Sequence, residues 1–161
     1  KITHARPRIA NFPFTTKSPT LGVAEIGESN FVVADIPGLI EGAHSGKGLG
    51  DRFLRHIERT RILIHLVDMA AVDGRNPNDD FVKLNNELIQ YSERLKRKKQ
   101  IVAANKMDMP EAKKNIKNFK AASGKKIYKI SAITGEGIPG LLKAAAKELK
   151  NIPKAEPAGE Y

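Results

Sequence analysis

Short apolar runs typical of β-strands alternate along this chain with longer segments in which apolar residues repeat every three or four positions. Strands are expected at residues 23–26, 31–35, 61–68, 100–105 and 126–130. The first two flank a polar turn and are predicted to form a hairpin. The others alternate with helices, which predicts an α/β fold with a mostly parallel sheet and helices on both faces. The run RILIHLVD at residues 61–68 is almost wholly apolar, as is typical of a strand covered on both faces.

Helices are expected where the apolar spacing changes to three and four. The candidates are residues 49–57, 77–95, 110–124 and 141–149. Start and stop signals support two of them, because Pro77-Asn78-Asp79 is typical of a helix start and Gly124 of a helix end. Residues 1–152 are predicted to form one domain, and residues 153–161, which contain Pro, Gly and Glu, a linker or tail.

Charge and composition exclude several classes of protein. The 161 residues contain 28 Lys and Arg against 18 Asp and Glu, a net charge of +10, which favours an anionic partner or marks a solvated basic surface. The absence of Cys excludes disulfides, thiolate metal sites and a cysteine nucleophile. No apolar run approaches the ~20 residues of a membrane span and the start is unlike a signal peptide, so a cytoplasmic location is expected.

His65 lies in an apolar strand and is predicted to be structural.

The strongest chemical signal is Asn105-Lys106-Met107-Asp108, which directly follows the strand at residues 100–105. Ligands of parallel α/β sheets bind at the carboxyl ends of strands. A carboxylate there can accept hydrogen bonds from the ring N1–H and the exocyclic amine of guanine. Adenine presents an acceptor at N1 and would leave that carboxylate unpaired, which gives discrimination between the bases.

Three weaker motifs stand at corresponding places. Asp35-Ile36-Pro37-Gly38 ends the strand at residues 31–35, where the carboxylate can hold a hydrated cation and the glycine allows close approach of a phosphate. Residues 131–133 (SAI) end the last strand, and residues 11–16 (NFPFTT) precede the first. A threonine hydroxyl there could be one ligand of Mg²⁺, which keeps most of its waters. Taken singly, each of the three is also compatible with an ordinary turn or strand entry.

In this order and spacing, the motifs resemble those of the translation-factor-related GTPases. The stretches RPRIANFPFTT, DIPGLIEGAHSGKGLGDRFLRHIERTRILIHLVD, NKMD and SAITGEG resemble the GTPase domain of the Obg family. The resemblance covers nearly the whole chain. It implies a Ras-like P-loop NTPase fold, GTP or GDP as the ligand, Mg²⁺ as the cofactor, and GTP hydrolysis in a molecular switch that acts in assembly of the large ribosomal subunit.

The resemblance also implies roles for individual residues around the phosphates. Thr16 would ligate Mg²⁺, Asp35 would hold the ion through water, and Gly38 would donate its N–H to the γ-phosphate. The other implied contacts in these two segments are Phe14, Thr15, Lys17, Ser18, Ile36 and Pro37.

At the base, the resemblance assigns guanine recognition to Asn105, Lys106 and Asp108, with Ala132 contacting the base through its backbone. The neighbouring Met107, Ser131 and Ile133 belong to the same implied site. Leu39 stands where Ras-like enzymes place the glutamine that orients water, so slow intrinsic turnover is predicted and no catalytic residue is assigned.

The phosphate-cradling motif G-x-x-x-x-G-K-[ST] does not occur in these 161 residues. Residues 42–48 contain Gly-Lys, but Gly48 stands where Ser or Thr is needed. The resemblance aligns residues 1–5 with the end of the helix that follows the P-loop, so the first strand and the P-loop are expected to be absent from this segment. The 161 residues alone are therefore expected to be inactive. The strands at residues 31–35 and 61–68 should not pair, because the absent strand would lie between them.

Two functional hypotheses remain open at this point. The first is the GTP-hydrolysing switch, a monomer that binds the large ribosomal subunit or its RNA. The second is a degenerate module that binds RNA or the ribosome without nucleotide. The basic run at residues 94–99 fits an RNA-facing surface, but it also fits the preference for cations at the end of a helix.

Overall fold

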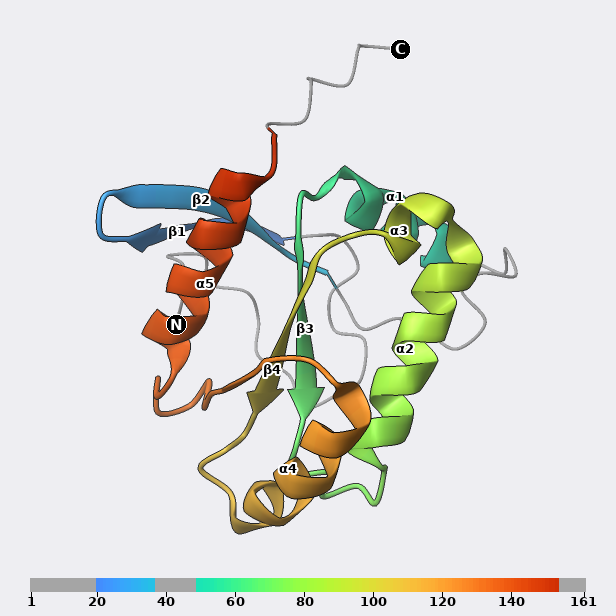
Figure 1. Cartoon of the computed structure of the whole chain (residues 1–161), viewed down its shortest axis with the longest axis vertical. Coiled ribbons are helices and arrows are strands. Elements are labelled where there is room, and N and C mark those ends of the chain that lie inside the picture. Colours follow the sequence, from blue (N-terminus) through green and yellow to red (C-terminus); the bar gives the residue numbers. More distant parts are fainter. Residues whose placement is uncertain (1–19, 37–48, 154–161) are drawn as a thin grey trace.

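The computed structural model describes residues 20–36 and 49–153 (Figure 1). Its centre is a parallel sheet of three strands in the order β3-β4-β5. These strands are β3 (Leu63–Asp68), β4 (Gln100–Asn105) and β5 (Ile127–Lys129). The chain crosses from one strand to the next through helices, as parallel pairing requires. The predicted α/β fold is confirmed, and it agrees with part of a P-loop NTPase domain.

The predicted hairpin is formed by β1 (Thr20–Ile26) and β2 (Ser29–Asp35). Its register pairs Ile26 with Ser29, so the turn consists of Gly27 and Glu28. Gly27 has a φ of 57°, a left-handed conformation that favours glycine. Within the described ranges, the hairpin is not hydrogen bonded to the parallel sheet, and β2 and β3 do not pair, as expected. Figure 1 shows β2 running across the direction of β3 and β4.

The helices are α1 (Leu49–Arg59), α2 (Pro77–Tyr91), α3 (Glu93–Lys96), α4 (Pro110–Ser123) and α5 (Ile138–Asn151). The prediction of one helix from Pro77 through Leu95 is wrong at Ser92, which is extended (φ −160°, ψ 150°). The Ser92 hydroxyl accepts a hydrogen bond from the Leu95 N–H at 3.2 Å and donates one to Glu58 Oε1 at 2.6 Å. A serine that caps a new helix in this way competes with continuation of the old one.

Helices cover both faces of the parallel sheet. On one face, α5 packs through Leu141, Leu142 and Ala145 against Ile101 and Ala103 of β4 and against the hairpin. On the other face, residues of α2 and α4 pack against β3 and β4, and Phe119 of α4 is buried there. Burial of a side chain of this size contributes about 2–3 kcal/mol.

The expected burial of β3 on both faces is wrong at Leu66, whose residue surface is 57% exposed. β3 is the edge strand of the described sheet, and α5 packs over β4 and the hairpin. Leu66 is therefore exposed, because no described element covers its side of β3.

A third cluster holds the amino-terminal end of β3. Leu54 and Ile57 of α1 pack against Leu88 and Leu95, and Leu63 packs against this group. Lys98 Nζ donates hydrogen bonds to the carbonyl oxygens of Glu58 and Thr60, where α1 ends.

None of the helices in the described ranges is long and apolar enough to cross a membrane.

Candidate functional site

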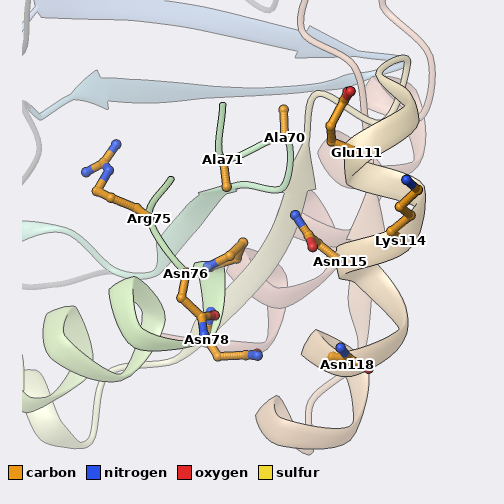
Figure 2. Close-up of a pocket in the computed structure, with 10 residues that line it drawn as sticks. Ala70, Ala71, Arg75, Asn76, Asn78, Glu111, Lys114, Asn115 and Asn118 are labelled. Carbon is orange, nitrogen blue, oxygen red and sulfur yellow. The ribbon is translucent and has the colours of Figure 1, made fainter. Parts of the chain in front are cut away.

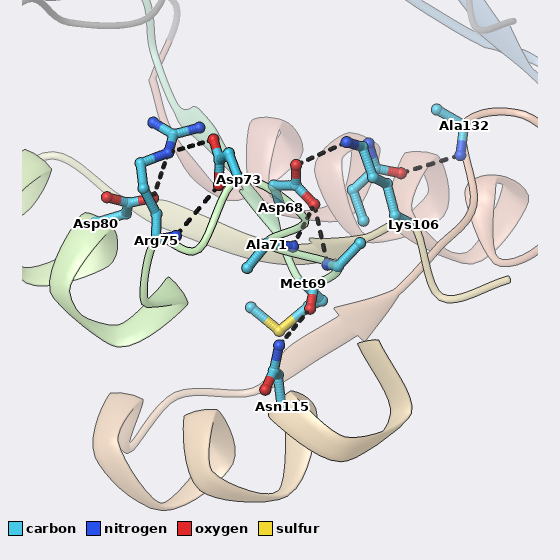
Figure 3. Close-up of polar contacts among 11 residues, drawn as sticks. Asp68, Met69, Ala71, Asp73, Arg75, Asp80, Lys106, Asn115 and Ala132 are labelled. Atoms are coloured by element: carbon cyan, nitrogen blue, oxygen red, sulfur yellow. Dashed lines mark hydrogen bonds and ion pairs between the residues drawn. The ribbon is translucent and has the colours of Figure 1, made fainter. Parts of the chain in front are cut away.

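Two of the predicted loops meet at the carboxyl edge of the sheet. Asn105 ends β4, and its Oδ1 accepts a hydrogen bond from the Ala132 N–H at 3.0 Å (Figure 3). The Met107 N–H donates to the carbonyl oxygen of Ile130 at 3.1 Å. Because β4 and β5 are parallel neighbours, the segments that follow them leave the sheet side by side. The structure therefore brings residues 105–108 together with residues 131–133.

The first loop turns sharply at Lys106, which has a φ of 62° although it is not a glycine. The Met109 N–H closes the turn on the Lys106 carbonyl oxygen at 2.9 Å. Such a backbone conformation costs of the order of 1–3 kcal/mol and persists where the surroundings fix it. Met107 packs against the buried cluster of β3, β4 and α4, whereas Asp108 is exposed at the end of the loop.

The second loop is built around Ser131, which is buried with 1% of its surface exposed. Its Oγ accepts from the Thr134 N–H at 3.1 Å, its carbonyl oxygen accepts from Gly135, and its N–H donates to the carbonyl oxygen of Glu136. All of these bonds lie within the loop, which makes it a compact turn. Ala132 and Ile133 are exposed on its outer side.

A residue outside the predicted site joins this edge of the sheet. Asp68 ends β3 and lies opposite Asn105 in the β3–β4 register. Its Oδ2 accepts a hydrogen bond from Lys106 Nζ at 2.7 Å, and its Oδ1 accepts from the N–H groups of Ala70 at 3.0 Å and Ala71 at 3.4 Å (Figure 3). The signal in the sequence was its position, since Asp68 ends a strand as Asn105 does.

The segment after β3 is tied to its neighbours through Met69. The Met69 N–H donates to the carbonyl oxygen of Asn105 at 3.2 Å. The Met69 carbonyl oxygen accepts from Asn115 Nδ2 of α4 at 2.9 Å. These contacts connect β3, β4 and α4 at one edge.

Two further predicted residues that the structure describes, Asp35 and Ile36, are not assembled with these loops. Asp35 is exposed at the end of β2, and no hydrogen bond or ion pair within the described ranges joins it to residues 105–108 or 131–133. Ile36 packs on the cluster that also contacts Leu63, at the amino-terminal end of β3. The reason is that β2 belongs to the hairpin and not to the parallel sheet. Phe14, Thr15, Thr16, Lys17, Ser18, Pro37 and Gly38 lie outside the described residues.

A polar groove of about 470 Å³ lies between the β3–α2 connection and α4 (Figure 2). Arg75, Asn76 and Asn78 line one side, and Glu111, Lys114, Asn115 and Asn118 line the other. None of the predicted base-reading residues lines this groove, so it is separate from the edge where those loops meet.

His65 is buried in β3 and stacks on Phe81 of α2, with 4.9 Å between ring centroids. Burial, with a smaller contribution from the charge of Lys125, lowers the pKa of His65 to about 4. The ring is therefore neutral at pH 7 and packs in the core, as predicted.

Comparison with known proteins now identifies the family. Residues 1–106 match the profile described as "50S ribosome-binding GTPase". The chain belongs to this family. The match includes β1 to β4 and ends within the Asn105-Lys106-Met107-Asp108 motif, so it contains Asp35 and Asn105 but stops before Asp108 and residues 131–133.

The similar proteins are named GTPase Obg, which confirms the resemblance seen in the motifs. The chain is 56% identical over 155 residues to the protein of Roseiflexus castenholzii and 54% identical over 156 residues to that of Geobacillus thermodenitrificans. For Brevibacillus brevis the identity is 52% over 153 residues. These alignments cover 94–95% of this chain but only 35–36% of the relatives, so the chain spans about a third of their length.

Proposed function

We propose that this chain supplies the guanine-recognition and switch segments of a GTP-hydrolysing molecular switch that acts in assembly of the large ribosomal subunit. The observation that carries the proposal is the junction of two loops, in which Asn105 bonds to Ala132 and the exposed Asp108 follows three residues after Asn105. Both loops lie at the carboxyl edge of a parallel sheet, where such folds bind ligands. Family membership supports the same assignment.

The proposed recognition follows from the donors and acceptors at this edge. The Asp108 carboxylate accepts from the N1–H and the amine of guanine, and the Ala132 N–H donates to the base carbonyl. The Lys106 side chain packs along the base. Since Asn105 Oδ1 accepts from the Ala132 N–H in this structure, the base carbonyl would share or replace that bond.

The phosphate side of the proposal rests on the family resemblance. Thr16 and Asp35 would hold Mg²⁺, which neutralises phosphate charge, and Gly38 would donate its N–H to the γ-phosphate. A single carboxylate and a hydroxyl suit Mg²⁺, because this ion keeps several waters. The exposed Asp35 carboxylate fits that role. Leu39 has no group that orients water, so we expect slow hydrolysis without a stimulating partner.

Nucleotide binding by the full-length protein tests the proposal. Fluorescent GDP, GTP and ATP analogues would be titrated with and without Mg²⁺, and GTP hydrolysis would be followed under single-turnover conditions. We expect binding of guanine nucleotides, no competition by ATP, and slow release of phosphate. Equal affinity for ATP and GTP would contradict the role of Asp108.

The second candidate is an RNA- or ribosome-binding module that does not need nucleotide. The observation in its favour is a basic groove lined by Arg61, Arg94, Arg97, Lys98 and Lys99 at the other end of the sheet. Co-sedimentation with large ribosomal subunits separates the two candidates. The switch hypothesis expects binding to depend on a non-hydrolysable GTP analogue, whereas the module would bind equally with and without it.

A further inference from the structure

We propose that Asp68 is a positioning residue for the guanine-binding loop and that it acts through Lys106. This inference rests on the proposed function and extends it to a residue outside the NKMD motif. Asp68 lies on β3 and Lys106 lies just after β4, so the contact joins two neighbouring strands at the edge where the base is proposed to bind.

The first support is the geometry of the carboxylate. One oxygen of Asp68 holds the N–H groups of Ala70 and Ala71, which fixes the orientation of the side chain. The other oxygen lies 2.7 Å from Lys106 Nζ. A charged hydrogen bond of this length is stronger than a neutral one. Both side chains are about one third exposed, at 32% for Asp68 and 38% for Lys106, so solvent weakens the pair but does not remove it.

The second support is the backbone that Lys106 occupies. Its φ of 62° is unfavourable for a lysine, so other contacts must hold the turn in place. The N–H groups of Met107 and Met109 make two of these contacts through the backbone. The ion pair with Asp68 holds the side chain at the same point. Asp108, which would read the base, comes two residues later and depends on the same turn.

The substitution Asp68→Asn separates the contacts of the two carboxylate oxygens. In Asp68→Asn, the amide oxygen can continue to accept from Ala70 and Ala71. The amide NH₂ group then faces the ammonium group of Lys106, so a donor meets a donor. This substitution therefore removes the contact with Lys106 while the bonds to the β3–α2 connection remain.

A matched control lies five positions further along the chain. Asp73 also divides its oxygens between a backbone N–H and a cation, here both from Arg75, with Oδ1 accepting from the Arg75 N–H at 3.3 Å and Oδ2 lying 2.7 Å from Arg75 Nε. Arg75 lines the polar groove and is not part of the guanine-binding loop. Asp73→Asn thus removes a carboxylate–cation contact of the same length, in a more exposed pair, without touching Lys106.

The first experiment measures amide hydrogen exchange of Met107 and Met109 in nucleotide-free full-length protein. We expect Asp68→Asn to accelerate exchange at both amides about 5- to 10-fold, and Asp73→Asn to leave them unchanged. Equal exchange in Asp68→Asn and wild type would overturn the proposal. This measurement needs no nucleotide, so it tests the positioning role of Asp68 independently of the proposed function. If the wild-type protein failed to bind guanine nucleotides, only the proposed function would be refuted.

The second experiment is a double-mutant cycle on GDP affinity with Lys106→Met, which removes the ammonium group and keeps an apolar stem. We expect Asp68→Asn to weaken GDP binding about 5- to 10-fold in wild type and to have no further effect in the Lys106→Met background. Additive losses would show that Asp68 does not act through Lys106 and would overturn the inference.

Discussion

A methyl group on Gly137 would lie 2.0 Å from the backbone carbonyl oxygen of Lys129. Gly137 also has a φ of 74°, so a side chain there meets both strain and a backbone clash. We expect Gly137→Ala to lower the free energy of unfolding by more than about 2 kcal/mol. Urea unfolding followed by circular dichroism measures this. The control is Gly140→Ala inside α5, the helix that Gly137 precedes as its N-cap; nothing lies within 4 Å of this position, and alanine should be neutral or stabilising.

The base specificity should change with Asp108→Asn. The amide can donate to the carbonyl that xanthine carries where guanine carries its amine, and it no longer accepts two hydrogen bonds from guanine. We expect affinity for GDP to fall about 10- to 100-fold and affinity for the xanthine analogue to rise. Competition titrations on the full-length protein measure both. Asp79→Asn, an exposed carboxylate on α2, should change neither affinity, and unchanged GDP binding in Asp108→Asn would refute the assignment.

Stability should fall in mild acid because of His65. Its pKa is about 4 in the folded protein and 6.5 in the reference state, so the unfolded chain binds more protons between these values. The stabilisation is fully present above pH 6.5 and is lost as the pH falls toward 4. We expect a loss of about 2 kcal/mol between pH 7.5 and pH 5 from this residue. His65→Phe keeps an aromatic ring stacked on Phe81. If the free energy of unfolding of this variant falls as steeply with pH as that of the wild type, His65 is not the cause.

The end of α1 should depend on Lys98. Its ammonium group donates to the carbonyl oxygens of Glu58 and Thr60, which are left without helical partners where α1 ends. We expect Lys98→Met to lower the free energy of unfolding by about 1 kcal/mol and to accelerate exchange in the last turn of α1. Lys96→Met removes only an exposed pair with Glu93 and should change stability by less than about 0.5 kcal/mol.

The regular elements could be predicted because their signals are local. Pro110 and Gly124 mark the bounds of α4, and Gly124 adopts the left-handed conformation expected at a helix end. The break at Ser92 was missed because a serine inside an apolar repeat is compatible with both a helix interior and a cap. The hydrogen bond that Ser92 donates to Glu58, which is distant in the sequence, supports the cap and has no local signal.

The candidate site was predictable in part for a related reason. Asn105 ends β4 and Ala132 comes soon after β5, and the order of these parallel strands alone brings such residues together. Asp35 ends a strand of the hairpin, and its sequence context does not reveal which sheet that strand joins. The place of Asp68 at a strand end was visible in the sequence, but its contact with Lys106 was not, because that side chain crosses from the neighbouring strand and no spacing within one segment encodes this.

The two kinds of strand pairing have a consequence for the order of folding. The hairpin closes through a turn of Gly27 and Glu28, so it can form within about 1–10 μs. The pairing of Leu63 with Gln100 and that of Val102 with Ile127 each require the chain to complete a crossover that contains a helix. Non-local pairings of this kind are slow, because the entropy of closing a long loop is lost before any contact forms. We therefore expect the edge that joins Asn105 and Ala132 to form late in folding, after the hairpin and the isolated helical turns.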